Sequence, residues 1–532
     1  MKVVIAEKTS PAAIQMFREE TDWTVITSDQ IHGDLGVQIA DADALVVRSA
    51  VDVNPELLAK AKKLRVIGRA GVGVDNINLD AATKQGIVVM NTPGGNAVAV
   101  AEHTFALMLS LARFLSRADS TTRAGKWEKK SLQGTELRGK TLGIVGLGRI
   151  GMEVAKRARA FEMKVVAHDP FVAQSMARDL GITLATRDEV FTAADYLSLH
   201  VGLTPQTQGM INPESIKKMK KGVRIVNCAR GELIDDAALA AALNAGQVGG
   251  AALDVFTQEP PKDSPLLACE NVIATPHIAG STNEAQEAVG VQIAQQVKEY
   301  LKRGVIQNAV NVPSVTDEEY AEMQPYMVMA ETLGSFLAQV AQGMTNLEEI
   351  ELRYTGKIGE WKTALIRNAA IKGVLNSMSQ EKANLVNAAQ LAQERGLRVQ
   401  ESKLQADGSG GAVNVLGIAL KAGANSYEAK ATVLYGGNNR LLNLNGINIE
   451  APLYGNLIYL RNKDVPGVIG KVGTITGNHG VNIANLALGR GEQIGNETES
   501  IAVIHVDGEV PAVVIEELRK VPAVVQVQAV RL

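Results

Sequence analysis

Short apolar runs alternate with helix-like stretches over roughly the first 300 residues. In the first hundred residues, four runs have strand length and are bounded by polar or turn residues: KVVIAE (2–7), ADALVVRS (42–49), LRVIGR (64–69) and GIVVMN (86–91). Segments of helical character, such as SPAAIQMFREE and NPELLAKAKK, lie between them. Continuous apolar runs that alternate with helices are typical of strands buried on both faces of a parallel sheet. Residues 1–96 are therefore predicted to form an α/β unit of their own.

A second α/β unit follows a long helical pattern, AVAVAEHTFALMLSLARFLSRADSTTRAG, which begins at Ala97. Its further apolar runs include MKVVAHD, YLSLHV, VRIVNCA and NVIATPH. Another helical segment, over residues 283–304, is expected to pack back onto the first unit. The prediction is a discontinuous first domain, residues 1–96 and 284–312, with a second domain of residues 97–283 inserted between its halves.

The chain beyond residue 312 has a different pattern. Residues 313–452 combine two helical segments, 316–343 and 362–378, with a hairpin that turns at 436–439, which indicates an α+β domain. Residues 453–532 follow the order strand, helix, strand, strand, helix, strand, the split βαβ pattern of ferredoxin-like domains. The predicted fold class is α/β, with two Rossmann-like doubly wound parallel-sheet domains, an α+β domain and a ferredoxin-like C-terminal domain.

Composition narrows the classes of function. The 532 residues include 54 Lys and Arg against 57 Asp and Glu, a net charge of -3 that argues against a nucleic-acid partner. Two cysteines, Cys228 and Cys269, exclude a disulfide framework, and no ligand cluster predicts a metal site. No window reaches the roughly 18 uninterrupted apolar residues of a membrane span, and the N-terminus lacks the apolar core of a signal peptide. We therefore expect a cytoplasmic protein with neither a nucleic acid nor a membrane as its partner.

A glycine-rich turn follows the apolar run 142–145. Gly146, Gly148 and Gly151 have the G-x-G-x-x-G spacing, in which the glycines permit a tight turn, approach to a pyrophosphate and close helix–strand packing. The helix that begins near Arg149 would point its free N–H groups at the phosphates. Asp169 ends the next strand, where a carboxylate accepts hydrogen bonds from a ribose hydroxyl and repels a 2′-phosphate. Because no arginine adjoins Asp169 in the sequence, the predicted cofactor is NAD rather than NADP.

Three polar residues stand at the ends of later strands. Arg230 follows VRIVNCA, Glu259 lies in LDVFTQEPP and His277 ends NVIATPH. The carboxyl ends of parallel strands meet on the side where open α/β sheets bind ligands. Oxidation of a hydroxy acid requires a cation for its carboxylate, an acid/base group for its hydroxyl proton and a carboxylate that orients this base. The pattern predicts these roles for Arg230, His277 and Glu259 respectively.

The segments VGLGRIG, NCARGELID, ALDVFTQEPP and TPHIAGST resemble the signatures of the D-2-hydroxyacid dehydrogenase family. VVRSAVDV, IGRAGVGVDNIN and NTPGGNAVAVAEHT are similar to the branch of that family that oxidises a phosphorylated glycerate. The two C-terminal regions resemble the long form of this branch, with an intervening regulatory domain (313–452) and a terminal ACT domain (453–532). The resemblance covers nearly the whole chain.

The resemblance implies roles for individual residues. It makes His277 the proton donor and acceptor, Glu259 its partner and Arg230 the clamp on the substrate carboxylate. It places Asp254 against the nicotinamide carboxamide. Further residues that it implies for the cofactor site are Arg149, Ile150, Cys228, Ala229 and Gly280.

Four cations outside these motifs are candidates for binding a phosphorylated substrate. Arg48 and Arg69 would face the substrate across the cleft, because a guanidinium offers a fork of donors to phosphate. Lys129 and Lys130 would add charge from a neighbouring subunit, in a homodimer or homotetramer, and solvated surface lysines without such a role are the alternative. His103 lies within an apolar helical pattern and is interpreted as a buried packing residue.

In the last domain the segment KDVPGVIGKVGTITGNHGVNI resembles the effector-binding turn of ACT domains. This resemblance implies that Asp464 and Asn482 hold a small amino acid, L-serine, across an interface between two paired domains. Such binding alters turnover only by favouring one arrangement of the domains over another. A purely structural role in oligomerisation is the alternative for this domain.

The resemblance implies NAD-dependent oxidation of 3-phospho-D-glycerate to 3-phosphohydroxypyruvate, the first step of the phosphorylated route to L-serine. Two alternatives stay open. Another member of the family could use Arg48 and Arg69 for a second carboxylate, with glycerate or 2-hydroxyglutarate as its substrate. A nucleotide-sensing protein, similar to the corepressors of this fold, is the other alternative, against which the ACT-like tail and the Arg–Glu–His set argue.

Overall fold

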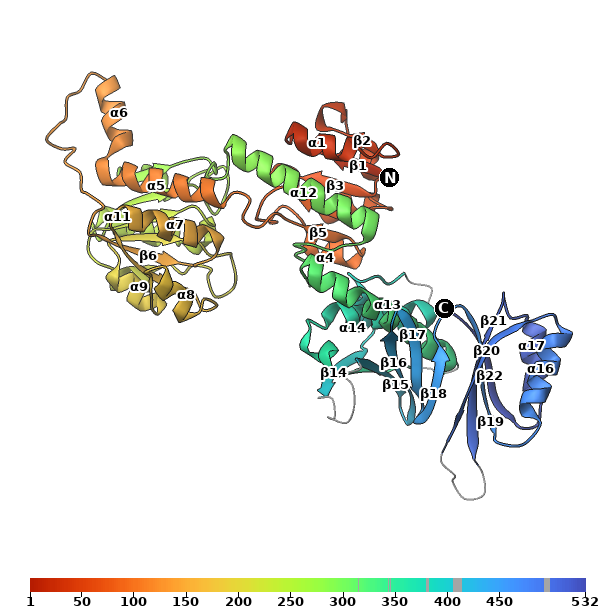
Figure 1. Ribbon diagram of the computed structural model, residues 1–532. Coiled ribbons are helices and arrows are strands. Elements are labelled where there is room, and N and C mark those ends of the chain that lie inside the picture. Colours follow the sequence, from red (N-terminus) through yellow and green to blue (C-terminus); the bar gives the residue numbers. More distant parts are fainter. Residues whose placement is uncertain (314, 343, 345, 379–381, 405–413, 492–497) are drawn as a thin grey trace.

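The computed structural model describes residues 1–313, 315–342, 344, 346–378, 382–404, 414–491 and 498–532. The strands of these residues form four separate sheets, and each sheet carries its own helices (Figure 1). Two of the sheets are parallel, one is mixed and one is antiparallel. The predicted fold class is confirmed.

The first lobe is built on a five-stranded parallel sheet of order β2-β1-β3-β4-β5. Its strands are β1 (Lys2–Ile5), β2 (Thr24–Ile26), β3 (Ala44–Val47), β4 (Val66–Arg69) and β5 (Val88–Met90). Its helices are α1 (Pro11–Arg18), α2 (Leu35–Ile39), α3 (Pro55–Lys60), α4 (Leu79–Lys84) and α12 (Asn283–Arg303). Four strands coincide with the predicted runs. The edge strand β2 was not predicted, because its three residues are too few to show a pattern.

The chain leaves the first lobe after β5 and returns to it as α12 (Figure 1). The side chain of Thr282 caps α12, and Gly304 ends the helix with a left-handed φ of 73°. As expected from the sequence, α12 packs against α1 and β4. Its residues in the first lobe's core include Val289, Ile293 and Val297. The chain therefore crosses between the two lobes twice, after β5 and before α12.

The second lobe is built on a seven-stranded parallel sheet of order β12-β11-β10-β9-β6-β7-β8. Its strands are β6 (Thr141–Val145), β7 (Lys164–His168), β8 (Thr183–Leu184), β9 (Tyr196–Leu199), β10 (Val223–Asn227), β11 (Val248–Leu253) and β12 (Val272–Ala274). Five of its helices are α7 (Arg149–Ala160), α8 (Gln174–Asp179), α9 (Arg187–Ala193), α10 (Pro213–Lys218) and α11 (Asp236–Asn244). The strand order reverses between β6 and β9, and ligands bind in the crevice at the carboxyl ends of such a pair.

The long helical pattern from Ala97 forms two helices where one was predicted. α5 (Ala97–Arg113) and α6 (Leu115–Arg123) meet at an angle of 63°. Phe114 between them has a left-handed backbone, with φ of 53°. The sequence shows neither proline nor glycine there, so the break could not be predicted. The apolar face of α5 is buried in the second lobe's own core, through residues such as Phe105, Met108 and Leu111.

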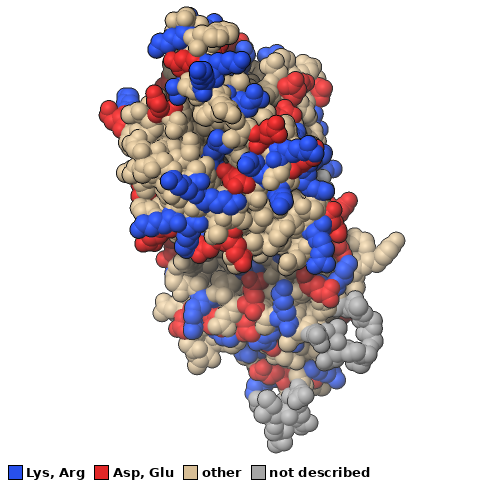
Figure 2. Space-filling model, turned by 90° about the vertical axis from the view of Figure 1, so that its left-hand side faces the viewer, with Lys and Arg blue, Asp and Glu red and all other residues tan. Residues whose placement is uncertain are grey.

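The surface carries charges of both signs. Lys and Arg side chains are interspersed with Asp and Glu over the face shown in Figure 2. Within the described residues, no single helix has both the length and the apolar character needed to cross a membrane, and α5 with α6 meets that test only as a bent pair.

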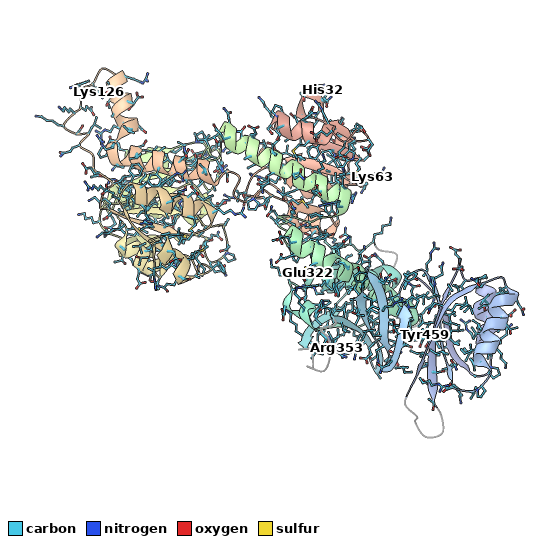
Figure 3. All side chains as sticks on the ribbon, in the orientation of Figure 1. His32, Lys63, Lys126, Glu322, Arg353 and Tyr459 are labelled. Atoms are coloured by element: carbon cyan, nitrogen blue, oxygen red, sulfur yellow. The ribbon has the colours of Figure 1, made fainter. Side chains whose placement is uncertain are left out.

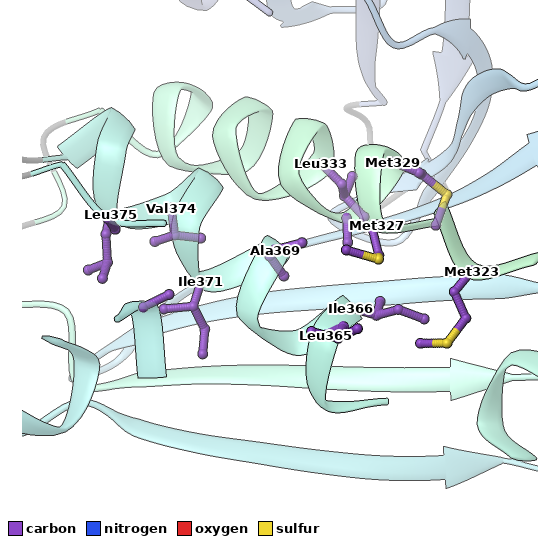
Figure 4. Close-up of a cluster of buried hydrophobic side chains, with 14 of the residues drawn as sticks. Met323, Met327, Met329, Leu333, Leu365, Ile366, Ala369, Ile371, Val374 and Leu375 are labelled. Atoms are coloured by element: carbon purple, nitrogen blue, oxygen red, sulfur yellow. The ribbon is translucent and has the colours of Figure 1, made fainter. Parts of the chain in front are cut away.

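The intervening domain has a mixed sheet of order β14-β13-β15-β16-β17-β18 and two long helices that pack against each other. Its elements are α13 (Asp317–Val340), β13 (Glu349–Thr355), α14 (Ala364–Met378), α15 (Ala388–Glu394), β14 (Arg398–Leu404), β15 (Val415–Ala422), β16 (Asn425–Leu434), β17 (Asn438–Leu444) and β18 (Ile447–Pro452). Methionine and leucine side chains of α13 interleave with aliphatic side chains of α14 (Figure 4). The predicted hairpin is present, but Asn438 and Asn439 lie in β17 and not in the turn.

The C-terminal domain is an antiparallel sheet of order β20-β21-β19-β22, covered on one face by α16 and α17 (Figure 1). Its elements are β19 (Asn456–Lys463), α16 (Val468–Asn478), β20 (Ile483–Arg490), β21 (Glu499–Val506), α17 (Ala512–Arg519) and β22 (Val524–Arg531). Gln339 of α13 both donates to the carbonyl of Arg531 and accepts from its amide. This pair of hydrogen bonds ties the edge strand β22 to the intervening domain.

Candidate active site

The glycine-rich turn between β6 and α7 has the geometry that its spacing predicts. Gly146 has a left-handed φ of 95°, and a Cβ there would lie 2.4 Å from the carbonyl oxygen of His200. A Cβ at Gly151 would lie 2.0 Å from the carbonyl oxygen of Gly146, so only glycine lets α7 approach β6 this closely. A Cβ at Gly148 would meet no protein atom within 4 Å. Gly148 therefore leaves open space in front of the first turn of α7.

A cavity of about 540 Å³ lies beside this turn at the carboxyl ends of β6, β7 and β9. Asp169 lines it, and its carboxylate accepts hydrogen bonds from the backbone amides of Leu147 and Phe171, both at 2.8 Å. The carboxylate is thus fixed at the end of β7. The open turn, the free N-terminus of α7 and this anchored carboxylate fit a dinucleotide with a free ribose hydroxyl.

An arginine that is not adjacent to Asp169 in the sequence also borders this cavity. Arg187, the first residue of α9, lines the cavity, and its Nη1 contacts the carbonyl oxygen of Gln206 at 3.5 Å. It lies 18 positions from Asp169 along the chain, so adjacency in the sequence could not reveal it. His200 lines the same cavity, and burial lowers the pKa of its ring to about 4.

The remaining residues predicted for the cofactor surround the turn and the interlobe crossings. Arg149 is the first residue of α7, and its side chain lies against Gly94. Ile150 packs against the second lobe's core, and Gly280 approaches Asn96 closely.

Burial raises the pKa of the Cys228 thiol to about 12, so the thiol is uncharged. Ala229 donates its amide to the side chain of Asn227 at 3.0 Å.

A second cavity, of about 330 Å³, lies between the two lobes. The first lobe contributes Arg48 and Arg69 to its lining, and the second lobe contributes Glu259 and His277. Glu259 Oε2 lies 2.7 Å from His277 Nδ1, and Glu259 Oε1 accepts a hydrogen bond from the Phe256 amide. The loop after β11 therefore orients the carboxylate of Glu259. This carboxylate in turn fixes the imidazole of His277, because it occupies Nδ1 and leaves Nε2 available.

Arg69 is a partly buried cation without a complete set of partners. Burial, followed by the nearby positive charge of Arg230, lowers its guanidinium pKa. Its Nε is buried and has no hydrogen-bond partner among the described residues, and the same holds for Oδ1 of Asn96, which lines the same cavity. Buried polar groups left unpaired are costly. The Nε–H of Arg69 is therefore suited to donate to an anionic ligand in this cavity, whereas Oδ1 of Asn96 can accept only from a donor such as a hydroxyl group.

Arg230 reaches across the lobe boundary and contacts the first lobe. Its Nη2 forms an ion pair of 2.8 Å with Oδ2 of Asp75, and its Nη1 donates to the carbonyl of Ala229. It is not among the residues that line the 330 Å³ cavity, although its charge acts on Arg69. The turn that bears it is held by the fully buried Asn227, whose amide donates to the Arg230 carbonyl. Sequence reasoning named neither Asp75 nor Asn227.

Asp254 is enclosed by the protein and is 0% exposed. Its carboxylate accepts hydrogen bonds from the hydroxyl of Thr275 and from the amides of Ile278 and Ala279. Burial opposes its ionisation, yet these bonds and one from His103 hold its pKa below the ordinary value. Side-chain and backbone donors of the protein thus hold this carboxylate in place. A contact of Asp254 with the nicotinamide stays a prediction.

The other predicted residues are not among those that line either of these two cavities. Lys129 and Lys130 are exposed in the segment after α6, and Lys126 on the same segment lies at the outer end of the second lobe (Figure 3). In the C-terminal domain, Asp464 pairs with Arg490 at 3.1 Å and Asn482 donates to Asp507 at 2.7 Å. Among the described residues, no group of three or more His, Cys, Asp or Glu could hold a metal ion.

Three family models match the chain. Residues 105–279 match the NAD-binding domain of D-isomer specific 2-hydroxyacid dehydrogenases. Residues 322–445 match the intervening domain of D-3-phosphoglycerate dehydrogenase, and residues 457–523 match the ACT domain. The three matches follow the second lobe, the intervening domain and the C-terminal domain along the chain.

The chain is similar to full-length D-3-phosphoglycerate dehydrogenases. It is 40% identical over 535 residues to that of Methanocaldococcus jannaschii, which covers 100% of both chains, and 39% identical to that of Bacillus subtilis, which covers 100% of this chain and 99% of the relative. A crystal structure of the TT0316 protein from Thermus thermophilus has a TM-score of 0.53 at 35% identity. The apo-structure of D-lactate dehydrogenase from Escherichia coli has a TM-score of 0.52 at 29% identity. Each structure covers 58% of this chain and is itself covered completely. The chain therefore belongs to the D-3-phosphoglycerate dehydrogenases, within the D-isomer specific 2-hydroxyacid dehydrogenase family.

Proposed function

We propose that this NAD-dependent dehydrogenase oxidises 3-phospho-D-glycerate to 3-phosphohydroxypyruvate, as the first step of the phosphorylated route to L-serine. One observation carries the proposal. The cavity between the lobes sets the His277–Glu259 pair on one wall and Arg48 and Arg69 on the other, and the buried Nε of Arg69 lacks a partner among the described residues. An acid/base group that faces cations across a cleft suits an anionic hydroxy acid.

The roles of the residues follow from this arrangement. NAD, held at the glycine turn and Asp169, supplies the hydride acceptor. Because Glu259 occupies Nδ1 of His277, Nε2 is the nitrogen that accepts the hydroxyl proton of the substrate. Glu259 stabilises the imidazolium that results. The C2 carbon of the substrate thus loses a hydride and its hydroxyl loses a proton, which leaves the 2-oxo acid.

The cations divide between the two ends of the substrate. We assign Arg230 to the carboxylate, and its ion pair with Asp75 holds its guanidinium at the lobe boundary before substrate arrives. We assign Arg48 and Arg69 to the phosphate, because they line the first-lobe wall of the cavity. A second carboxylate in place of the phosphate, as in 2-hydroxyglutarate, is the competing use of these two arginines.

Formation of NADH, followed by its absorbance, tests the proposal directly. Purified protein is mixed with NAD and, separately, with 3-phosphoglycerate, D-glycerate or D-2-hydroxyglutarate. The proposal predicts that kcat/KM is highest for 3-phosphoglycerate. A higher value for either other acid assigns the cavity to that acid, and no NADH with any of them rejects the activity.

We also propose a homodimer or homotetramer, in which Lys129 and Lys130 of one subunit approach the substrate phosphate of its neighbour. Their exposure supports this placement, on a segment whose Lys126 lies at the outer end of the second lobe (Figure 3). The ACT domain would bind L-serine through Asp464 and Asn482. A cytoplasmic location is part of the same proposal, and cell fractionation tests it.

A further inference from the structure

His103 has polar contacts that a packing residue would not need. It lies in the middle of α5, and its ring is 19% exposed. Its Nε2 lies 3.2 Å from Oγ1 of Thr275 and 3.4 Å from Oδ1 of Asp254. The sequence predicted a packing residue, because it could not show that the strand end at Thr275 faces this turn of the helix.

The proton positions in this network follow from its chemistry. Asp254 accepts from the Thr275 hydroxyl at 2.6 Å, so the one hydroxyl proton of Thr275 is directed to the carboxylate. Oγ1 of Thr275 then offers only lone pairs to His103. The imidazole must therefore carry its proton on Nε2 and act as the donor, both to Thr275 and towards Asp254.

Asp254 connects this hydrogen-bond network to the loop that carries His277, the proposed acid/base residue. Its carboxylate accepts from the amides of Ile278 and Ala279, and its backbone carbonyl accepts from the amide of His277 at 2.9 Å. His277 itself has a left-handed φ of 53°, which a residue with a side chain rarely adopts. The buried Asp254 thus accepts hydrogen bonds from three consecutive backbone amides, those of residues 277–279. The left-handed backbone of His277 is unfavourable by itself, so these contacts must stabilise it.

We propose that His103 is a positioning residue of the dehydrogenase, which fixes Thr275 and the buried Asp254 and through them the loop of His277. The inference rests on the proposed function for its effect on turnover, but its effect on the loop is independent of substrate. Loss of the Nε2 donor removes one of the few hydrogen bonds that stabilise a carboxylate with no access to water. The loop then shifts, and small shifts of an acid/base group lower turnover strongly.

The test compares His103→Leu with His103→Gln, which keeps an N–H donor at about the reach of Nε2. Glu102→Gln, an exposed neighbour on the same helix, is the control. We expect His103→Leu to lower kcat about tenfold or more with KM changed by less than about threefold, because the cations that bind substrate are untouched. We expect His103→Gln to recover most of kcat, and Glu102→Gln to resemble the parent protein.

Hydrogen exchange of the amides of Ile278 and Ala279 gives a readout that needs no substrate. The proposal predicts faster exchange at these two amides in His103→Leu, with exchange in the strands β11 and β12 unchanged. Thr275→Val, which removes the linking hydroxyl, should have the same effect, and Thr275→Ser should not. Unchanged exchange at both amides in His103→Leu, or equal loss in His103→Leu and His103→Gln, would overturn the proposal. If the parent protein oxidises none of the acids, the proposed function fails, while the exchange measurement still decides the role of His103.

Discussion

Two glycines of the first lobe leave room for the guanidinium groups that meet at the lobe boundary. A Cβ at Gly71 would lie 1.4 Å from Nη1 of Arg69, and a Cβ at Gly73 would lie 2.1 Å from Nη2 of Arg230. Gly71 also has a positive φ of 152°. The two glycines of the segment RAGVG thus serve the site because they have no side chain that would occupy the space of these guanidinium groups.

Arg69 gives the first prediction. Substituting Arg69→Gln removes the charge but keeps a polar side chain, and a hydrogen bond to a charged group is worth about 1.5–3 kcal/mol, or roughly tenfold or more in binding. We expect KM for 3-phosphoglycerate to rise by about that factor while KM for D-glycerate changes little, as steady-state kinetics would measure. Equal losses for the two acids would show that Arg69 does not contact the phosphate. Lys63→Gln, on the exposed surface of the first lobe, is the control.

His200 gives a prediction about pH. Its ring pKa is lowered to about 4 by burial, so the folded protein keeps it uncharged, whereas the ring of the unfolded chain binds a proton below about 6.5. Stability must therefore fall as the pH drops from about 6.5 towards 4. We expect the melting temperature of the parent protein to fall more steeply over this range than that of His200→Asn. Parallel melting curves for the two proteins would contradict the assignment.

For individual residues, the sequence predicted contacts between side chains that follow neighbouring strands. It did not predict contacts that depend on how distant parts of the chain pack together. Glu259 and His277 follow adjacent strands, β11 and β12, so their proximity follows from a parallel sheet. Asp75 meets Arg230 only because the two lobes face each other. Nothing in the spacing of these residues reveals that contact. The polar role of His103 was hidden in the same way, by an apolar helical pattern.

At the scale of elements, two glycines of the unit β6–turn–α7 have different roles, one in packing and one in cofactor binding. Gly151 packs the helix against the strand, whereas Gly148 faces open space. We therefore expect Gly151→Ala to lower the free energy of unfolding by about 1–3 kcal/mol, because the added methyl group must displace backbone. Gly148→Ala should leave stability unchanged and weaken NAD binding about tenfold or more, because the methyl group occupies the approach of the pyrophosphate.

Thermal melting and NAD titration by fluorescence separate these effects. The two variants carry the same added methyl group, so each serves as the control for the other. Loss of stability in Gly148→Ala, or unchanged NAD affinity in that variant, would contradict the division of roles.

Regular elements were predictable where hydrophobic periodicity alone determines them. Residues 86–91 read as a strand because both faces of the sheet are covered, and β5 is found there. The edge strand β2 and the two-residue strand β8 show no such pattern because they are short and partly exposed. The break at Phe114 depends on one backbone conformation that tertiary packing selects, so it left no signal in the sequence.

At the scale of the whole molecule, the two proposed effector residues lie at opposite ends of the C-terminal sheet. Asp464 follows Lys463, whose partner on β21 is Glu499, whereas Asn482 precedes Ile483, whose partner is Val506. The strand β21 between these levels has eight residues, about 25 Å at the usual rise per residue. A single small amino acid cannot bridge that distance, so a site that uses both residues requires two chains.

Mixed oligomers test this requirement. We expect Asp464→Ala and Asn482→Ala each to abolish inhibition by L-serine while leaving uninhibited turnover intact. Co-refolding the two variants should restore part of the inhibition, because a mixed pair contains one site with both residues present. Absence of recovery in confirmed mixed oligomers would contradict a shared site.

The presence of four separate sheets was predictable because each part of the chain has a distinct pattern, and α12 packs against the first lobe as the sequence predicted. The bounds of the four domains stay predictions. How the domains contact one another was not predictable. The hydrogen bonds between the side-chain amide of Gln339 and the backbone of Arg531, for example, join residues 192 positions apart and carry no signature in the sequence.

The account depends above all on His277 as the group that accepts the hydroxyl proton in the cleft between the lobes. The most direct measurement compares His277→Ala with the parent protein for kcat with 3-phosphoglycerate and for the dissociation constant of NAD. The account predicts that kcat falls by roughly 10²–10⁴-fold while NAD binding changes by less than about twofold. Turnover close to that of the parent protein would contradict it.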